Sequence, residues 1–369
     1  MATPTSPSSA PAALPASEES TFHPSLGQPG CEVIYHPSPL LKPSEEDENE
    51  EDTTFTVSIP PASLPHIFAH RQWRAGMILA DLLISPTSSG LIEGKVVLEL
   101  GCGTALPALV AARAGAAFVL ATDYDEEQVV RVLRQNVGRA LREDPDLEGR
   151  VKGAGYTWGR DPDDIFDLLP TPPSRSGGGK FDTIVLADTL WDPLSHADLA
   201  KSLSLTLSKT REARVVVVAG LHTGRERIGD FVRKVRRVGL EILPSSSSRE
   251  SDREGVSLRG LWDELERIDE PSLEALLSNR HPEEIASDEW MSSILEFELA
   301  PDSPDSSSPS TTIHARGPRL TGRRRTFVAE EKYRPEEGKE RGGVRVRNRW
   351  MTLWMLEWGE GALATRRGC

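Results

Sequence analysis

Two glycines and a carboxylate in the segment 99–123 have the types and spacing needed to hold a nucleoside. Gly101 and Gly103 directly follow a short apolar run, and glycines at such a turn let a ligand approach the backbone closely. Asp123 follows about 20 residues later, where a carboxylate can reach ribose hydroxyls. This spacing indicates a site for a nucleoside-containing cofactor.

The glycine spacing also restricts the kind of cofactor. A dinucleotide site would carry a third glycine at position 106, but that residue is Leu106 and Pro107 follows it. The pattern present is acidic-x-Gly-x-Gly, with Glu99 as the acidic residue and Cys102 between the glycines. It suits a cofactor with an amino-acid tail and no phosphates. An ordinary strand–turn–helix whose glycines only permit packing is the alternative.

Hydrophobic spacing predicts the elements that position these residues. Residues 96–100 and 118–121 are apolar runs typical of strands buried on both faces, and residues 105–114 have helical spacing before Gly115. Further strands are expected at 54–59, 151–158, 181–188, 215–219 and 240–243, with helices at 126–141, 196–207 and 225–238. This alternation predicts an α/β fold with a mainly parallel sheet.

Further candidate residues fall at the carboxyl ends of these strands, where ligands bind in open α/β sheets. Trp158 ends one strand, Ala187 and Asp188 end another, and Trp191 follows three residues later. A carboxylate there could orient an amine through charge-assisted hydrogen bonds. The alternatives are a rim aromatic at Trp158 and a capping role for Asp188. His222 lies at the same edge, where a lone His in a turn is more often structural.

Four segments together resemble the seven-stranded S-adenosylmethionine-dependent methyltransferases, and among them the family-16 lysine methyltransferase-like group. The segments are ELGCGTALPALVAARAGA (99–116), ATDYD (121–125), GYTWG (155–159) and LADTLWD (186–192). The likeness covers residues 68–240 and the last strand near Trp350.

The resemblance implies a Rossmann-like sheet of seven strands with helices on both faces and an antiparallel last strand. It implies S-adenosylmethionine as cofactor, with the glycines at its methionine part, Asp123 at the ribose and Trp158 near the adenine. No metal is implied. The residues expected to bind the cofactor are Trp73, Glu99, Gly101, Cys102, Gly103, Asp123, Trp158 and Ala187, and those expected at the methyl acceptor are Asp188 and Trp191.

Three of these positions carry specific expectations. The resemblance places Trp73 beside the sulfonium as a cation–π wall, with plain packing at a helix N-terminus as the alternative. The family usually has Gly where this chain has Ala105. Since Ala can be helical there, we expect cofactor binding to survive. Trp191 stands where the family has Tyr or Phe.

On the substrate side, the likeness is to fungal enzymes that methylate the N-terminal region of translation elongation factor 1-alpha. It implies a protein N-methyltransferase acting on a lysine or N-terminal amine, working as a monomer with a protein partner. Methylation of the small molecule nicotinamide is one alternative. A non-catalytic, cofactor-binding scaffold is the other.

Composition sets the wider limits. Only 37% of the 369 residues are hydrophobic and 28 are proline, which predicts a compact core with disordered additions. The net charge of −14 argues against a nucleic-acid partner. Three scattered cysteines cannot form a disulfide framework, which predicts a reducing, cytoplasmic setting. Without an apolar run of about 18 residues, no membrane span is expected.

We expect four parts in the chain. They are a disordered acidic arm (1–53), the methyltransferase core (54–244), a largely disordered insertion (245–342), and the final strand with the tail (343–369). Glutamates interleave with the arginines of the tract 321–349, which favours a solvated loop there.

Overall fold

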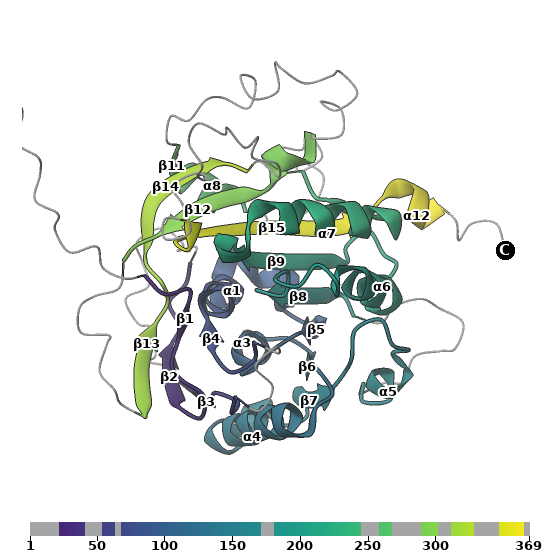
Figure 1. Cartoon of the computed structure of the whole chain (residues 1–369). Helices are drawn as coiled ribbons and strands as arrows, with labels where there is room; N and C mark the ends of the chain where they lie inside the picture. Colours follow the sequence, from purple (N-terminus) through teal and green to yellow (C-terminus); the bar gives the residue numbers. More distant parts are fainter. Residues whose placement is uncertain are drawn as a thin grey trace, which may run out of the picture.

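A central sheet with helices on both faces forms the body of the molecule (Figure 1). The structure, a computed structural model, describes residues 22–40, 54–62, 68–170, 181–244, 258–267, 289–301, 311–327 and 347–364. Everything below refers to these residues.

Seven strands of this sheet follow the order β7–β6–β5–β8–β9–β15–β10. Their bounds are β5 Val96–Leu100, β6 Phe118–Asp123, β7 Val151–Gly155, β8 Thr183–Ala187, β9 Arg214–Gly220, β10 Leu240–Ile242 and β15 Trp350–Trp358. The strands β5 to β9 run parallel, whereas β15 is antiparallel to both β9 and β10. The predicted seven-stranded sheet with an antiparallel last strand is confirmed.

The central strands are apolar on both sides because helices cover both sides. Within β5, Val97 packs in the apolar cluster on one face and Leu98 in the cluster on the other. One layer contains α1 Arg74–Ile84, α2 Ser89–Ile92, α3 Leu106–Arg113 and α4 Glu127–Glu143; the other contains α5 Asp163–Phe166, α6 His196–Thr206 and α7 Arg225–Arg237. Among the described residues no single helix is long and apolar enough to cross a membrane, although Arg74–Ile84 and Pro86–Ile92 pass that test as a pair bent by 87°.

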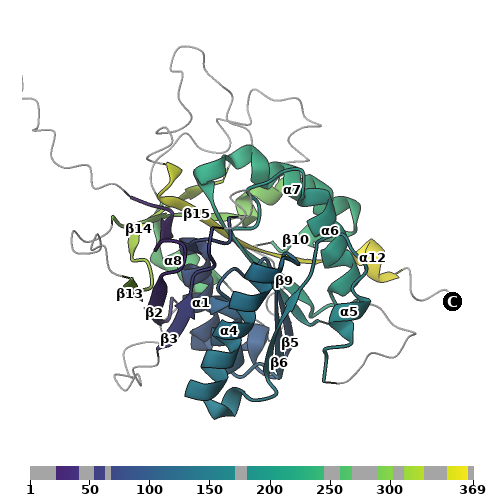
Figure 2. The same ribbon diagram turned by 60° about the horizontal axis from the view of Figure 1, so that its bottom comes forward.

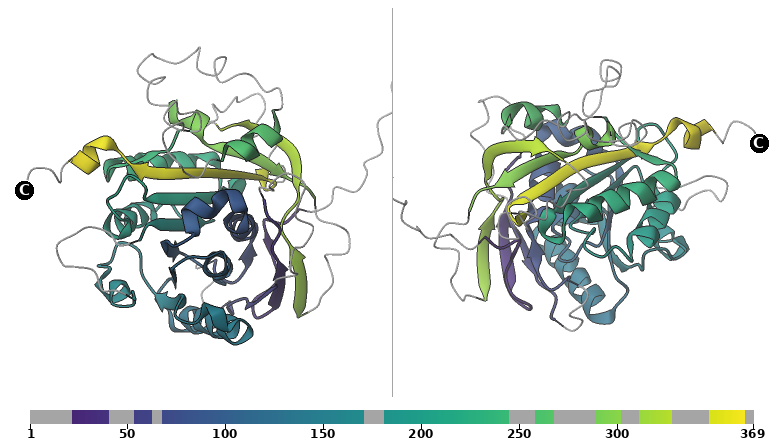
Figure 3. Two further views of the ribbon diagram at one scale, coloured as in Figure 1. Left: turned by 180° about the vertical axis from the view of Figure 1, so that it is seen from behind. Right: turned by 45° about the horizontal axis from the view of Figure 1, so that its top comes forward.

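Three more strands widen the sheet beyond β15. β12 Leu295–Leu299 pairs with the first half of β15, while β10 pairs with its last three residues. β14 Leu320–Thr326 then pairs with β12, and β11 Glu266–Arg267 with β14. Figure 3 shows the two longer strands in light green along the yellow β15.

A separate small sheet joins the start of the chain to the insertion. β2 Glu32–His36 lies between β3 Phe55–Ser58 and β13 Thr312–Arg316. Figure 2 shows β2 and β3 beside α4. A short ribbon pairs β1 Ser25–Leu26 with β4 Gln72–Trp73. A helix, α12 Glu360–Ala364, follows β15.

These strands lie partly in two segments that were expected to be disordered. Residues 22–40 of the expected disordered arm contain β1 and β2, since Val33 and Tyr35 alternate into the core. The described parts of the expected disordered insertion contain α8 Arg259–Glu264, a 3-10 turn Glu289–Ser293 and the strands β11 to β14. The rest of both predictions lies outside the described residues.

The expected solvated loop in the arginine-rich tract is also wrong over β14. Arg325 is buried there, and both it and Arg225 of α7 donate to the buried carboxylate of Glu296 on β12. A buried charge needs such partners, because desolvation costs several kcal/mol for each ion. The partner Glu296 lies on the neighbouring strand β12, outside the arginine-rich tract, so the charge composition of the tract alone did not reveal this pairing.

A buried carboxyl ties the first segment of the chain to the core. Asp81 of α1 accepts hydrogen bonds at Oδ1 from Tyr35 Oη, 2.6 Å away, and from the backbone N–H of Ser38, 2.9 Å away. Burial raises the pKa of Asp81 from 3.8 to about 7. The folded protein therefore holds a proton on Asp81 at pH values where the unfolded chain has lost it.

This difference predicts a pH-dependent stability. Stability from the protonated carboxyl is complete below about pH 4, the unfolded pKa, and is lost as the pH rises through 7. Between pH 5 and 8 the free energy of unfolding of the wild type should fall relative to Asp81→Asn by about 2–3 kcal/mol. Urea unfolding at both pH values measures this; the exposed Asp164→Asn is the control and should follow the wild type. A constant difference between wild type and Asp81→Asn would contradict the prediction.

Candidate cofactor and acceptor site

A cavity of about 430 Å³ opens at the carboxyl ends of β5, β6 and β8. All ten residues that the sequence singled out line it: Trp73, Glu99, Gly101, Cys102, Gly103, Asp123, Trp158, Ala187, Asp188 and Trp191. The structure thus brings together residues spread over more than a hundred positions, while their individual roles stay predictions.

The backbone turn after β5 forms the floor of this cavity. The carbonyl of Thr122 on β6 accepts hydrogen bonds from the N–H groups of both Gly101 and Cys102, each at 2.9 Å. Gly101 has φ +74°, and a Cβ there would lie 3.0 Å from the side chains of Trp158 and Thr189. Only glycine meets both conditions, so the turn leaves bare backbone facing the cavity.

Asp123 fixes the second glycine. Its Oδ2 accepts from the N–H of Gly103 at 2.6 Å, and its Oδ1 accepts from the N–H of Tyr124 at 2.7 Å. The side chain is buried, and this burial raises the pKa of Asp123. A carboxylate has about four acceptor positions, so two remain for the hydroxyls of a ligand.

Glu99 has a structural partner in addition to its place at the cavity. Its Oε2 accepts from the N–H of Ala108 at 2.9 Å, which satisfies one of the free donors in the first turn of α3. Burial raises the pKa of Glu99 well above its ordinary value. Burial likewise raises the pKa of the Cys102 thiol, so Cys102 is a packed side chain without thiolate reactivity.

The residue after this turn departs from expectation. Ala105 has φ +66° and ψ +18°, a left-handed conformation, and directly precedes α3. The prediction that Ala105 is helical is therefore wrong. A left-handed backbone costs a residue with a Cβ roughly 1–2 kcal/mol, so this position explains why a glycine would suit it.

Three polar residues that sequence analysis missed hold the turn in place. Thr104 Oγ1 donates to Gln72 Oε1 at 2.6 Å, and Asn136 of α4 donates to the Thr104 carbonyl at 3.1 Å. Asn136 also exchanges two hydrogen bonds with the backbone of Ser58, the last residue of β3. A polar residue on the apolar face of the helix was the available indication for Asn136.

Aromatic rings form the other side of the cavity. Trp191 packs edge-on against Phe68 with ring centroids 4.9 Å apart, and Phe68 is 41% exposed at the mouth. Trp73 stacks on His222 at 5.2 Å with the planes only 10° apart, and its indole N–H donates to the Phe68 carbonyl. His222 thus supports Trp73, which fits the structural role expected for it.

Asp188 holds an uncommon backbone conformation next to these rings. Its φ is +57°, and its Oδ1 accepts from the N–H of Gly220 at the end of β9, 3.0 Å away. The carboxylate therefore joins two strand ends instead of capping the following turn. Left-handed non-glycine residues cost about 1–3 kcal/mol and cluster at functional sites.

Trp158 lies on the loop after β7, because the strand ends at Gly155 and not at residue 158 as predicted. The indole is half-buried and contacts the position where Gly101 leaves room. The shorter strand still delivers Trp158 to the cavity.

The charges of the lining favour a cationic ligand. Five carboxyl groups line the cavity, those of Glu99, Asp123, Asp188, Asp192 and Asp198, together with a single Arg71. The Arg71 guanidinium donates to the Gly27 carbonyl at 2.6 Å. Among the described residues, the buried Thr189 Oγ1 has no hydrogen-bond partner, so the lining still has a polar group to offer a ligand. Bare glycine backbone, a buried carboxyl group with acceptor positions left over and aromatic walls fit a nucleoside cofactor with a positive charge.

Comparison with known proteins finds similarity over part of the chain. A family model described as lysine methyltransferase matches residues 66–238. A protein N-terminal and lysine N-methyltransferase EFM7 of Gibberella zeae is 34% identical over 149 residues, which are 39% of this chain and 55% of the relative. Its namesake in Emericella nidulans is 31% identical over 153 residues, covering 41% and 58%. The chain thus spans little more than half the length of these two relatives.

A longer match extends further along the chain. The relative of the same name in Yarrowia lipolytica is 28% identical over 212 residues, covering 54% of this chain and 72% of the relative. Among solved structures, a magnesium protoporphyrin IX methyltransferase from Synechocystis PCC 6803 with bound SAH has 18% identity and a TM-score of 0.33, covering 46% and 75%, a likeness too distant to bear on the site.

The left-handed Ala105 predicts a measurable strain. Ala105→Gly and Ala111→Gly each remove a buried methyl and add backbone freedom, but only the first relieves a left-handed residue. Ala105→Gly should therefore be more stable than Ala111→Gly by about 1–2 kcal/mol. Urea unfolding of the two variants measures the gap. Equal stability would show that position 105 carries no strain.

Proposed function

We propose that this chain transfers a methyl group from S-adenosylmethionine to an amine of a protein, on the premise that residues 66–238, which match a family model described as lysine methyltransferase, form a methyltransferase domain. The acceptor is a lysine side chain or an N-terminal amine. The observation that carries the proposal is one cavity whose lining combines bare glycine backbone, buried carboxyl groups and three indoles.

The residues of the cavity divide into two groups under this proposal. Gly101 and Gly103 leave space for the methionine part, Asp123 offers its remaining lone pairs to the ribose, and Trp158 offers an indole face to the adenine. The indole of Trp73 lines the same cavity, where an aromatic face stabilises a cationic sulfur. When bound, the cofactor supplies a methyl group that is already electrophilic because it is attached to a positive sulfur.

The chain's part in the reaction is to hold and orient the amine. Asp188 and Trp191 lie together on the acceptor side, where a carboxylate accepts an N–H bond and an indole face packs against the carbon attached to nitrogen. Correct orientation alone lowers the activation barrier by up to about 7–11 kcal/mol. The amine must be neutral to attack, and an α-amine with a pKa of about 7.7–8.0 loses its proton more readily than a lysine at about 10.4.

The protein acceptor proposed first is the N-terminal region of translation elongation factor 1-alpha. Its support is the likeness of the motifs in this chain and the similarity to relatives named as protein N-terminal and lysine N-methyltransferases. A monomeric enzyme in the cytoplasm would meet newly made factor, and both properties belong to the proposal.

The cofactor role of Asp123 is tested by binding alone. Asp123→Asn keeps the size of the side chain but leaves one acceptor oxygen for the two backbone donors and the ribose. Loss of one charged hydrogen bond predicts S-adenosylmethionine binding weaker by about 10- to 100-fold. Titration calorimetry measures this, with the exposed neighbour Asp125→Asn as the matched control. Equal affinity in the two variants would remove Asp123 from the site.

The activity is tested with cofactor carrying a labelled methyl group and purified elongation factor 1-alpha. Label on a lysine or on the N-terminus, mapped by mass spectrometry, is the expected outcome. Asp188→Asn should lower kcat by at least about tenfold, since it removes a charged hydrogen-bond acceptor, and should leave cofactor affinity unchanged. Labelled nicotinamide in a parallel reaction would favour the small-molecule alternative. Cofactor binding without transfer to any protein of a lysate would favour a scaffold.

A further inference from the structure

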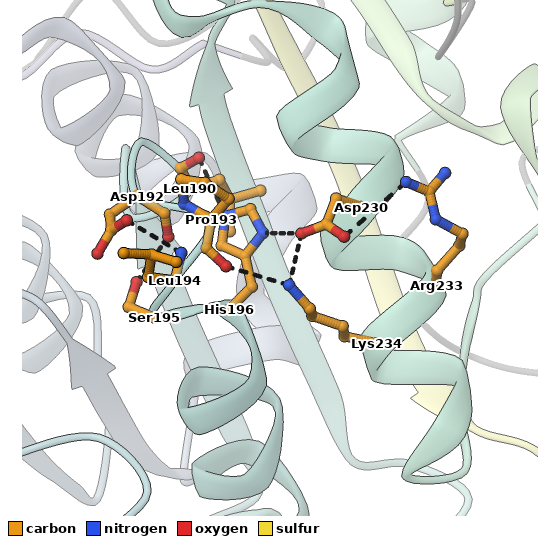
Figure 4. Close-up of polar contacts among 9 residues, drawn as sticks. All are labelled: Leu190, Asp192, Pro193, Leu194, Ser195, His196, Asp230, Arg233 and Lys234. Atoms are coloured by element: carbon orange, nitrogen blue, oxygen red, sulfur yellow. Dashed lines mark hydrogen bonds and ion pairs between the residues drawn. The ribbon is translucent and has the colours of Figure 1, made fainter.

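The loop that brings Trp191 and Asp192 to the cavity is tied down on both sides by groups outside the cavity. Leu190 precedes these two residues and Pro193 follows them. Both backbone carbonyls point away from the cavity toward α6 and α7 (Figure 4). The close-up shows these two carbonyls approached by one side chain each.

His196, the first residue of α6, contacts the Leu190 carbonyl, which precedes Trp191 and Asp192. Its Nε2 lies 3.1 Å from the Leu190 carbonyl oxygen, and its Nδ1 lies 2.9 Å from Asp230 Oδ2 on α7. The ring is fully buried and packs edge-on against Phe231 at 5.5 Å. Carbonyl and carboxylate oxygens only accept, so the contact with Leu190 needs a proton on Nε2 and the contact with Asp230 needs one on Nδ1.

Lys234 contacts the Pro193 carbonyl, which follows Trp191 and Asp192. Its Nζ donates to the Pro193 carbonyl oxygen at 3.1 Å and to Asp230 Oδ2 at 2.6 Å. Asp230 therefore holds both residues through one oxygen atom. Burial acts to raise the pKa of Asp230, but the hydrogen bonds from Lys234 and His196 outweigh it and hold the pKa below its ordinary value.

Arg233 gives a natural comparison within the same helix. Its guanidinium lies 3.8 Å from Asp230 Oδ1, carries the same charge as Lys234, and is 58% exposed. Figure 4 shows it on the far side of Asp230, pointing away from the loop. If α7 acted on the loop through charge alone, replacing Arg233 or Lys234 would have the same effect. Lys234 in addition donates a hydrogen bond to the loop, at the Pro193 carbonyl.

We propose that His196 and Lys234, joined through Asp230, form a positioning clamp that fixes the loop 190–193 and so sets Trp191 and Asp192 at the acceptor side of the cavity. None of the three clamp residues lines the cavity, so they act through the loop and not on the substrate. The effect on methyl transfer rests on the proposed function. The effect on the loop itself does not.

Hydrogen exchange measures the clamp directly. The backbone N–H of Leu194 donates a hydrogen bond to Asp192 Oδ1, and that of Ser195 donates to the Asp192 carbonyl. Hydrogen exchange at these two amides therefore reports how often the loop opens. Lys234→Met should speed their exchange by about tenfold, because it removes a charged hydrogen bond to the Pro193 carbonyl. Arg233→Met removes the same charge without touching the loop and should exchange like the wild type.

Two substitutions of His196 separate its two contacts. In His196→Asn the amide nitrogen takes the place of Nδ1 toward Asp230 and nothing reaches Leu190. In His196→Gln the amide nitrogen takes the place of Nε2 and restores the bond to Leu190. Faster exchange in the Asn variant and rescue in the Gln variant are expected. If the His196 variants fail to fold, the partly exposed Lys234 and Arg233 pair decides the question.

The kinetic readout uses the same variants with the labelled acceptor. Lys234→Met should raise KM for the protein acceptor by about tenfold, with the affinity for S-adenosylmethionine within about twofold of the wild type. Equal exchange rates in Lys234→Met and Arg233→Met would overturn the clamp. If wild-type enzyme methylates no acceptor, the proposed function fails, and the exchange rates still decide whether the clamp exists.

Discussion

One backbone carbonyl and one carboxylate on β6 determine the shape of the site. The carbonyl of Thr122 accepts from two successive N–H groups of the turn after β5, and the next residue, Asp123, accepts from Gly103. The two strands are neighbours in the parallel sheet, so their register places these acceptors opposite the turn. Neighbouring side chains pack against this turn. Trp158 and Thr189 lie over Gly101, and Glu99 at the end of β5 accepts a hydrogen bond from the first turn of α3.

Around this floor, the site is held by polar groups that themselves stay out of it. Asn136 connects the turn to the small sheet, and His196 and Lys234 connect the acceptor loop to α7. Such groups are costly to bury and are retained where each donor finds an acceptor. The glycine turn and the loop 190–193 thus have separate supports.

The central strands and their helices could be predicted from the sequence because the strands are short apolar runs separated by helical periodicity. The glycine turn, Asp123 and Asp188 could be predicted because backbone chemistry demands those residue types at strand ends. The insertion could not, because Arg325 of β14 is buried, and only a partner distant in sequence, Glu296, makes this favourable. Ala105 was misjudged for a related reason, since backbone φ follows from the turn as a whole and not from the residue's own preference.

The place of β15 in the sheet has a consequence for folding. This strand pairs with β9 along most of its length, yet β10 to β14 lie between the two in the sequence. Until β15 is in place, the apolar β9 has an unpaired edge, and unpaired apolar edges invite pairing with other chains. Pairing of β9 with β15 is therefore a long-range step, and it closes an edge on which folding competes with aggregation.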